Sequence, residues 1–551
     1  MSRIASIVAL IIAGVVSYAL WAHLGRPIDI VDVPRGHLQC LSYTPATDAS
    51  SPLNAKDGLF SVPDGMIEND LKILSQYTDC IRTYSMLGDQ GKTMKAAADA
   101  GIKVMVGIWI GADDERNELE INRALELAHQ YPQAVRAIIV GNEVLLRREM
   151  TGERLARIIA SVKARTDFPV TYADIYEFWR RNPVVGETVD LVTVHVLPYW
   201  DDPHPVSIDE VQAHSRRIIE QTQTLFPGKT VQIGEIGWPS AGRTRSGGSP
   251  TLVHQARFVR EFAAQAESIG VPYNLIEAID QPWKRMPEGT VGGYWGILDK
   301  DRVLKFPLTG PVSEWPNWKL AAGFTAAVSL LAFAWALLWR KPITAPRWIG
   351  LGLVAPAVGA TLWALGAQLG LIVLNNWWGW VWISWLMVLA VIGGALLIYA
   401  VAGGRNVPKP AGFDGVVSAF RNRKFDGAQL IGAYHWAVML PAVVLALSMA
   451  LDGRHRDFLQ LAFWLPAAAF LLLHLQPSTR ERSDQPQPEE AWVAALLLIA
   501  GPFAIDQFIN LEAVVWAATC VMLSVPWLGF AIREAKRIDL AFRGRTRGAI
   551  G

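Results

Sequence analysis

Two glutamates stand at the ends of hydrophobic runs, where a carboxylate is unexpected. Glu143 closes the run AVRAIIVGNEV (134–144), and Glu235 lies in the run TVQIGEIGWPS (230–240). An ionised carboxylate near a hydrophobic strand tip is unfavourable unless it has a partner. Singly, each glutamate is most simply interpreted as a helix cap or as half of an ion pair. Together, two carboxylates in one cleft can act as an acid and as a nucleophile or base.

Aromatic and polar residues gather at the ends of the other hydrophobic runs. The candidate binding residues of this kind are Tyr43, Tyr84, Asn142, Tyr199, Trp200, Trp238, Asp280 and Trp283. Tyrosine and tryptophan combine a large apolar face with a polar group, which suits the apolar faces of pyranose rings. One aromatic residue at a strand end is usually part of a core, whereas several on the same face favour a sugar groove. The two glutamates are then a pair that flanks a glycosidic bond.

Short hydrophobic runs alternate with amphipathic stretches over residues 36–306. The predicted strands are 37–45, 80–86, 103–111, 134–144, 169–176, 189–200, 230–240 and 273–283. Predicted helices with apolar residues at helical spacing separate them, for instance 65–78 and 117–131. Eight strand–helix units predict an α/β fold of the (β/α)8 TIM-barrel type. A doubly wound open sheet is the rival fold, but no glycine-rich phosphate-binding turn follows the first strand.

The barrel fold places the two glutamates at one end of the molecule. In a TIM barrel the active site lies at the carboxyl ends of the strands, where the polar and aromatic residues accumulate. Glu143 ends the fourth run and Glu235 ends the seventh, on roughly opposite sides of the barrel mouth. We therefore expect both carboxylates in one cleft, with pKa values separated by closeness and partial burial.

Hydrophobicity divides the chain of 551 residues into four parts. Residues 1–23 contain an apolar run and are interpreted as an uncleaved signal anchor, with a cleaved signal peptide as the alternative. Residues 24–318 are mixed in character and carry the predicted barrel. Residues 319–532 are predicted to form a membrane domain of about seven transmembrane helices, and residues 533–551 a basic cytoplasmic tail.

The charges of the loops predict how the spans are oriented. The spans after the barrel lie near 319–339, 348–368, 379–402, 430–451, 458–475, 491–509 and 511–532. With the N-terminus inside and about eight spans in all, most basic loops and the C-terminus fall in the cytoplasm. The barrel is then exported across the cytoplasmic membrane, to the periplasm or the extracellular space. The balance of 51 Lys and Arg against 50 Asp and Glu gives no indication of a nucleic-acid partner.

Cysteine and histidine indicate little further chemistry. Cys40 and Cys80 lie in the exported region, where an oxidising compartment permits a disulfide. Buried free thiols are the simpler interpretation in apolar runs, and the disulfide stays open. His195 and Asp174 are interpreted as structural groups, with a catalytic role as the alternative. No cluster of His, Cys and Asp has the spacing of metal ligands, so neither a metal nor a cofactor is expected.

Four motifs carry a resemblance to a known family. They are IRTYS (81–85), VGNEVLLR (140–147), VTVHVLPYW (192–200) and IGEIGWPS (233–240). Residues 36–306 resemble glycoside hydrolase family 17, a family of barrel-shaped, retaining β-1,3-glucanases and glucanosyltransferases. The resemblance implies that Glu143 is the acid/base, that Glu235 is the nucleophile and that Asn142 binds the sugar 2-hydroxyl.

One motif departs from the family pattern. Plant members carry a glutamate on the last strand, shortly before a lysine, whereas this chain reads DQPWK (280–284). Lys284 matches the lysine and joins the candidate substrate-binding residues. Gln281 stands where the carboxylate is expected, so the linkage preference is not carried over from the family.

The resemblance and the attached membrane part predict a membrane-anchored retaining enzyme that acts on β-glucan. The expected activity is that of a β-1,3-glucan glucanosyltransferase, which remodels or branches glucan outside the cytoplasmic membrane. The alternative within the family is a β-1,3-glucan endo- or exo-hydrolase. The alternative of another class is a glucan conduit or binding protein with an accessory barrel, although binding alone does not need both glutamates. The expected partners are β-glucan and membrane lipid, with a glucan synthase as a further candidate.

Overall fold

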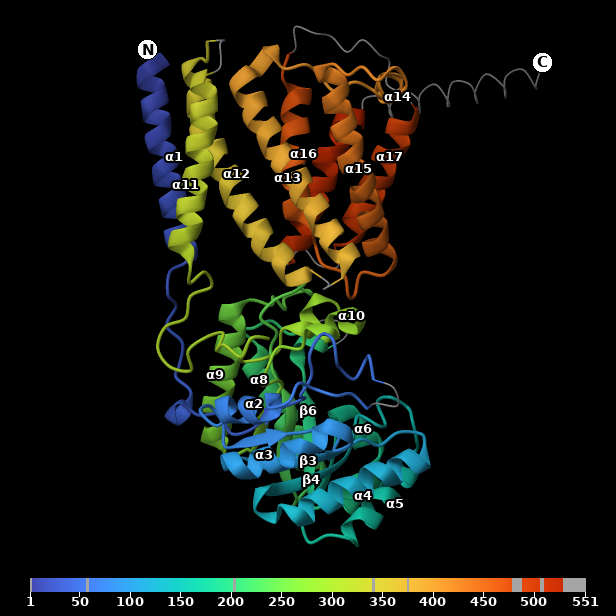
Figure 1. Ribbon diagram of the computed structural model, residues 1–551. Helices are drawn as coiled ribbons and strands as arrows, with labels where there is room; N and C mark the ends of the chain where they lie inside the picture. The colour runs from blue at the N-terminus through green and yellow to red at the C-terminus, as the bar shows by residue number, and fades with distance from the viewer. Residues whose placement is uncertain are drawn as a thin grey trace, which may run out of the picture. The chain divides into compact units, whose positions relative to one another are not determined.

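The computed structural model describes residues 2–55, 59–201, 205–338, 342–373, 376–477, 488–505 and 510–528. The chain divides into two compact units, of which one is Pro27–Glu314 and the other combines Met1–Arg26 with Trp315–Gly551. The first unit contains the β-strands and the second is helical (Figure 1).

The first unit is a closed barrel of eight parallel strands that follow one another in sequence order (Figure 1). The strands are β1 (Leu41–Ser42), β2 (Cys80–Arg82), β3 (Lys103–Ile108), β4 (Val135–Asn142), β5 (Val170–Ile175), β6 (Leu191–Val196), β7 (Thr230–Ile236) and β8 (Tyr273–Leu275). Leu41 of β1 pairs with Leu275 of β8, which closes the barrel. The predicted TIM-barrel fold is confirmed. The predicted runs are longer than the strands because they include loop residues at the strand ends.

Helices alternate with the strands. They are α2 (Met66–Leu74), α3 (Lys92–Ala100), α4 (Asp114–Gln130), α5 (Gly152–Lys163), α6 (Tyr176–Arg181), α7 (Pro183–Thr188), α8 (Val211–Leu225), α9 (Leu252–Ile269) and α10 (Arg285–Glu288). The side chains of Asp113, Thr151 and Thr251 accept backbone N–H groups at the starts of α4, α5 and α9. Such caps satisfy donors that a helix start leaves open, which fixes where these helices begin.

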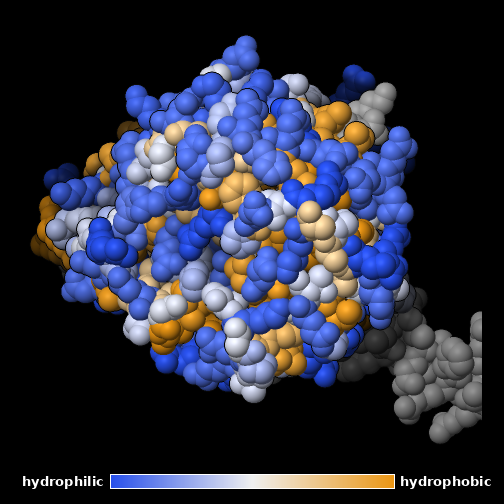
Figure 2. Space-filling model, turned by 90° about the horizontal axis from the view of Figure 1, so that it is seen from below, coloured by the Kyte–Doolittle hydropathy of each residue, from blue (hydrophilic) through white to orange (hydrophobic). Residues whose placement is uncertain are grey.

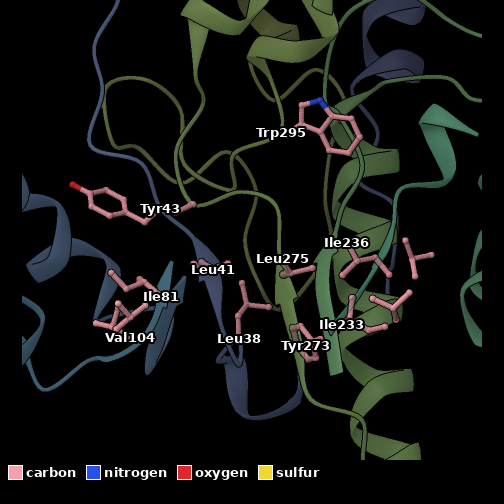
Figure 3. Close-up of a cluster of buried hydrophobic side chains, with 14 of the residues drawn as sticks. Leu38, Leu41, Tyr43, Ile81, Val104, Ile233, Ile236, Tyr273, Leu275 and Trp295 are labelled. Atoms are coloured by element: carbon pink, nitrogen blue, oxygen red, sulfur yellow. The ribbon is translucent and has the colours of Figure 1, made fainter. Parts of the chain in front are cut away.

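The strands of the barrel are packed in a core of buried hydrophobic side chains. Leu41, Ile81, Val104, Ile233 and Leu275 come from five strands and are almost completely buried. Figure 3 shows them along the neighbouring strands of the barrel. Burying a side chain of this size stabilises a fold by roughly 1.5–3 kcal/mol. The strand framework is thereby rigid enough to keep polar residues at its ends in fixed positions.

A disulfide lies on the interior side of β1 and β2. Side chains alternate along a strand, so Cys80 and Arg82 of β2 point to the same side. Arg82 reaches the carbonyl group of Gly234 on β7, which identifies that side as the barrel interior. Cys80 is bonded to Cys40, with 4.4 Å between the two Cα atoms. Free thiols were the simpler interpretation of the sequence because the spacing of the two residues does not reveal that they lie on adjacent strands.

A buried arginine ties together the two ends of the barrel unit. Arg260 of α9 has no exposed surface and donates five hydrogen bonds, of 2.6–3.3 Å, to acceptors in segments 30–32 and 307–310. Ile28 and Val312 add an antiparallel bridge with backbone hydrogen bonds of 2.8 and 2.9 Å. The segments that enter and leave the barrel, 28–32 and 307–312, are therefore joined to each other and to α9, and are called the strap below.

The second unit consists of hydrophobic helices. They are α1 (Ser2–Leu24), α11 (Trp318–Leu338), α12 (Ala345–Ile372), α13 (Trp377–Gly403), α14 (Phe413–Asn422), α15 (Gly427–Leu451), α16 (Gln460–Leu475), α17 (Pro488–Phe503) and Leu511–Leu528. Within the described ranges, six are long and apolar enough to cross a membrane, judged by length and composition alone. These six are Arg3–Leu24, α11, α12, α13, α15 and Leu511–Leu528.

Two predicted spans are shorter than expected. The span 458–475 corresponds to α16 and the span 491–509 overlaps α17, each with 16 residues. Sixteen residues extend about 24 Å, less than the roughly 30 Å of a hydrocarbon core. Pro466 and Pro502 lie inside these helices. The predicted tail 533–551 falls outside the described residues, and the count of about eight spans stays a prediction.

The surfaces of the two units differ in polarity. The face of the barrel unit in Figure 2 is mostly hydrophilic, with scattered hydrophobic patches, as expected for a domain in water. In the helical unit, Leu320, Leu331 and Leu451 are 66%, 71% and 86% exposed. Exposed leucines on long apolar helices are typical of a surface that faces lipid.

The predicted topology can be tested with reporter fusions. Seven predicted spans separate Pro316 from Arg547, and an odd number places the two positions on opposite sides of a membrane. A phosphatase fused after Pro316 should be active outside the cytoplasm, and a fluorescent protein fused after Arg547 should fluoresce inside it. The same location for both fusions would mean that one of the two short helices does not cross.

Replacing Arg260 should weaken the fold. Arg260→Met removes a fully buried guanidinium and its five hydrogen bonds to partly exposed segments, which should lower the free energy of unfolding by about 2–3 kcal/mol. Arg257→Met is the matched control, because Arg257 pairs with Asp209 and Glu261 at the partly exposed surface of the same helix. That change should cost less than about 1 kcal/mol. Thermal unfolding of the full chain in detergent compares the two, and equal losses would contradict the strap.

Candidate active site

Four polar side chains from four strands meet inside the barrel mouth. Arg82 of β2 donates a hydrogen bond to Oε1 of Glu235 of β7, at 2.7 Å, and another to Oδ1 of Asn142 of β4. Nε2 of His195 of β6 lies 3.0 Å from the same Asn142 oxygen and 3.7 Å from Glu235. Arg82 is completely buried and Glu235 nearly so. A permanent positive charge, removed from water, therefore stands beside one of the two predicted catalytic glutamates.

The strand register brings Glu235 into this cluster. Between β6 and β7 the pairing shifts after Val194, so that Gly234 is an extra residue and His195 pairs with Glu235. A Cβ atom at Gly234 would lie 2.5 Å from Cγ2 of Thr193 and 2.8 Å from the His195 ring. Only glycine fits there, and the extra residue lets Glu235 point toward Arg82.

Glu143 follows β4 directly and has an unusual backbone. Its φ of 53° lies in the left-handed region, which residues other than glycine seldom adopt. Its side chain is half-buried. Ligand atoms of Glu143, His195 and Glu235 lie within 4.8 Å of one another. The structure thus brings the two predicted glutamates together in one site.

The two carboxylates have opposite pKa shifts. Burial raises the pKa of Glu143 to about 8, and the negative charges of Glu235 and Asp174 add to the increase. Burial would also raise the pKa of Glu235, but its interactions with His195 and with the Arg82 guanidinium lower it overall. At neutral pH Glu143 is therefore protonated while Glu235 is ionised.

Tyr84 and His195 complete the surroundings of Glu235. The Tyr84 hydroxyl donates to Oε1 of Glu235 at 2.8 Å, and burial raises the pKa of this phenol, so that it keeps its proton. Burial lowers the pKa of His195 to about 4, so its ring is neutral near pH 7. Arg82 is then the permanent charge that keeps Glu235 ionised at neutral pH.

A cavity of about 440 Å³ opens beside Glu235. The predicted site residues in its lining are Tyr84, Asn142, Glu235, Trp283 and Lys284. Phe60 and Trp109 also line it, although neither was singled out from the sequence. Their rings, with that of Trp283, offer apolar surface of the kind that suits a sugar ring.

A buried ion pair at the cavity was missed from the sequence. Nζ of Lys284 lies 2.9 and 3.1 Å from the two carboxylate oxygens of Glu277, which follows β8. Burial raises the pKa of Glu277 to about 7. Gln281, at the position where the family carries its carboxylate, instead accepts from the indole N–H of Trp283. Glu277 stands inside a hydrophobic run, which is the signal that singled out the other two glutamates and could have found it.

Six predicted site residues are not among those that line this cavity. One is Glu143, and the other five are Tyr43, Tyr199, Trp200, Trp238 and Asp280. The Tyr43 hydroxyl donates to Asp70 at 3.0 Å, and the Tyr199 hydroxyl donates to the carbonyl group of Arg243 at 2.7 Å. Figure 3 shows the Tyr43 ring directed away from the barrel strands. The buried hydroxyls of these two tyrosines thus bind protein groups.

The remaining three of these residues also contact protein groups. Trp238 is fully buried in the hydrophobic core. Trp200 is half-buried and stacks on Trp295. Asp280 is buried and pairs with Lys305 at 2.8 Å. A residue at a strand end can point to either side of the barrel wall, and its type does not reveal which.

Glu143, His195 and Glu235 have the chemistry of metal ligands and lie close enough to share an ion. The Arg82 guanidinium, however, holds Oε1 of Glu235 and repels a cation. The raised pKa of Glu143 favours a neutral carboxyl group, which is a poor ligand. The arrangement fits proton transfer and nucleophilic attack better than metal binding, and the expected absence of a metal stays a prediction.

One family model and several known proteins are similar to this chain. Residues 40–296 match the model of the BtgE/BtgC glycoside hydrolase domain. A glucan 1,3-beta-glucosidase of Schizosaccharomyces pombe is 27% identical over 257 residues, which are 43% of this chain and 79% of that protein. A glucan 1,3-beta-glucosidase of Arthroderma benhamiae is 27% identical over 270 residues, which are 44% of this chain and 86% of that protein.

A solved structure is also similar to part of the chain. It is the glycoside hydrolase family 17 beta-1,3-glucanosyltransferase from Rhizomucor miehei, with 24% sequence identity and a TM-score of 0.43. The match covers 49% of this chain and 96% of that one.

The raised pKa of Glu143 predicts a stability that depends on pH. The unfolded carboxyl group ionises near pH 4.5 and the folded one near pH 8, so folding requires proton uptake between these values. The contribution of Glu143 to the free energy of unfolding should therefore fall as pH rises from 4.5 to 8. Glu143→Gln removes this loss and should stabilise the protein by on the order of 2 kcal/mol at pH 7.5, with no gain at pH 4. Thermal unfolding at both pH values measures the difference, and an equal gain at both would contradict the raised pKa.

Proposed function

Residues 40–296 form a glycoside hydrolase domain of the BtgE/BtgC family, and from this premise we propose that the protein is a membrane-anchored, retaining β-1,3-glucan glucanosyltransferase. Such an enzyme cleaves a β-glucan and transfers one fragment to another glucan chain. The observation that carries the proposal is the pair of glutamates with opposite pKa shifts. One protonated and one ionised carboxyl group are what glycosyl transfer through a covalent intermediate needs.

Glu235 is the nucleophile in the proposed first step. Its carboxylate attacks the anomeric carbon while Glu143 donates its proton to the leaving glycosidic oxygen, which gives a glycosyl ester on Glu235. Arg82 and Tyr84 both hold Oε1, which leaves Oε2 for the attack. The approach of the two carboxylates to within 4.8 Å supports retention, for which a spacing of about 5–5.5 Å is typical.

Glu143 is the base in the proposed second step. It takes the proton from a hydroxyl group of the acceptor, whose oxygen attacks the anomeric carbon and releases Glu235. Two inversions at one carbon retain its configuration. A glucan acceptor gives transfer, whereas water gives hydrolysis.

Asn142 is proposed to bind the 2-hydroxyl of the reacting sugar. Arg82 and His195 both contact its Oδ1, so its Nδ2 remains to donate to a substrate in the cavity that Asn142 lines. Within the described part of the chain, this Nδ2 has no acceptor. A hydrogen bond to the 2-hydroxyl strengthens in the transition state and so lowers the barrier.

The aromatic cavity favours transfer over hydrolysis. Phe60, Trp109 and Trp283 give it apolar walls that can bind a sugar ring and exclude water. The alternative of a β-1,3-glucan hydrolase is favoured by the names of the two relatives described above, which are glucan 1,3-beta-glucosidases. The linkage that transfer would form, β-1,3 or β-1,6, is a separate question for product analysis.

The hydrophobic helices are proposed to hold the barrel at the outer face of the cytoplasmic membrane. Residues 1–23 would serve as the signal anchor, 24–318 as the exported enzyme and 319–532 as the membrane domain. Six helices with the length and composition of spans support this arrangement. In that location the enzyme would act on exported β-glucan, with a glucan synthase as a candidate neighbour.

Product analysis distinguishes transfer from hydrolysis. Purified protein is incubated with β-1,3-linked gluco-oligosaccharides of a single length, and the products are separated by size and linkage. Products longer than the substrate are expected, and Glu143→Gln and Glu235→Gln should each lower turnover by on the order of 10³-fold or more.

Circular dichroism is the control for the fold of the Glu143→Gln and Glu235→Gln variants.

Trp283→Ala should weaken oligosaccharide binding by on the order of 1 kcal/mol, because a ring that can stack on the sugar is lost. Only shorter products, at high as well as low substrate concentration, would identify a hydrolase instead.

A further inference from the structure

The turn that carries Glu143 is held by the neighbouring strand β5. Three backbone N–H groups of residues 143–146 find acceptors there. The acceptors are the carbonyl group of Ala173 at 2.8 Å, the hydroxyl of Tyr172 at 3.1 Å and a carboxylate oxygen of Asp174 at 3.4 Å. Strand β5 thus fixes the backbone of the turn that carries Glu143, the acid/base candidate.

Asp174 and Tyr172 perform the capping that the sequence suggested for Glu143. A tight turn leaves N–H groups that its own backbone does not bind, as at the start of a helix. Tyr172 donates its hydroxyl proton to Oδ2 of Asp174, and the backbone N–H of Ile175 donates to Oδ1 at 2.8 Å. Both side chains are fully buried and fixed by these bonds. The carboxyl group of Glu143 is therefore released from capping and lies close to that of Glu235.

Asp174 also acts on Glu143 through its charge. Burial raises the pKa of Asp174 to about 6, so Asp174 is already ionised near pH 8, where Glu143 titrates. The charged or titratable groups that face Glu143 are Glu235 from β7, Asp174 from β5, His195 from β6, Arg82 from β2 and Arg147 from its own turn. The two carboxylates oppose the ionisation of Glu143 and the two arginines favour it.

We infer that Tyr172 and Asp174 form a clamp that positions Glu143, with Tyr172 holding the turn and the negative charge of Asp174 favouring the protonated acid. The clamp rests on the proposed function, in which Glu143 is the acid/base. Both side chains are fully buried and bind the backbone of the turn, so both are positioning residues rather than catalytic ones. The left-handed backbone of Glu143 is the conformation that the clamp maintains.

Three substitutions in the full chain distinguish the effect of the Asp174 charge from that of the hydrogen bonds that fix the turn. Asp174→Asn keeps a side-chain oxygen for the turn but removes the charge, and should lower the pKa of Glu143 by about one unit. Tyr172→Phe keeps the charge and removes one acceptor, and should lower kcat by about 10-fold or more with little change in that pKa. Asp190→Asn is the matched control, because Asp190 also accepts a backbone N–H of β5, that of Val170 at 2.8 Å, but at the opposite end of the barrel. It should change neither quantity.

Of two readouts, the first is independent of the proposed function. The pKa of Glu143 is read from the pH dependence of the difference in stability between each protein and the same protein with Glu143→Gln. The alkaline limb of kcat/KM with β-1,3-gluco-oligosaccharides is the second readout, and it should move to lower pH in Asp174→Asn alone. Asp174→Glu, which keeps the charge, should retain the high pKa and serves if Asp174→Asn does not fold.

Each outcome decides one of the two hypotheses. An unchanged pKa of Glu143 in Asp174→Asn overturns the clamp, even if transfer of glucan is observed. An equal fall in Asp174→Asn and Tyr172→Phe also overturns it, because loss of burial rather than loss of charge would then be the cause. If no protein acts on glucan, the proposed function fails, while the stability readout still tests the clamp.

Discussion

The guanidinium group of Arg82 determines the state of the polar side chains around it. It is completely buried, and a buried charge requires a counter-charge and hydrogen-bond acceptors. Glu235 and the Gly234 carbonyl group supply these from β7, and Asn142 supplies another from β4. This pairing keeps Glu235 ionised and orients Asn142 through its oxygen. The negative charge that remains on Glu235 opposes ionisation of Glu143, so the protonated state of one glutamate depends on the ionised state of the other.

The barrel could be predicted because eight hydrophobic runs with helices between them leave few other folds. The glutamate pair could be predicted because a carboxylate at the end of a buried strand is rare and both stood on suitable strands. Arg82 lay inside the motif IRTYS but was not recognised as the centre of the site. Its partners Asn142 and Glu235 are 60 and 153 residues away, and contacts across a barrel have no characteristic spacing.

The aromatic residues were harder to place because the direction of a side chain, and not its type, decides whether it lines the cavity or packs in the core. Tyr84, Tyr199 and Trp238 lie two or three residues beyond β2, β6 and β7, where strand alternation no longer sets the direction of a side chain. Tyr84 reaches the cavity, whereas Tyr199 and Trp238 are buried in the core. The disulfide of Cys40 and Cys80 depended likewise on the neighbouring positions of β1 and β2. None of these positions follows from local composition.

The barrel is inserted between two helices instead of being joined to the chain by one end. Its entering and leaving segments are paired through Ile28 and Val312, and Arg260 binds both. A pull on a glucan held in the cleft is therefore shared between α1 and α11, which reduces the tension on each peptide connection. A protease that cuts one connection leaves the barrel attached through the other. Release of the barrel from the helical unit would need two cuts.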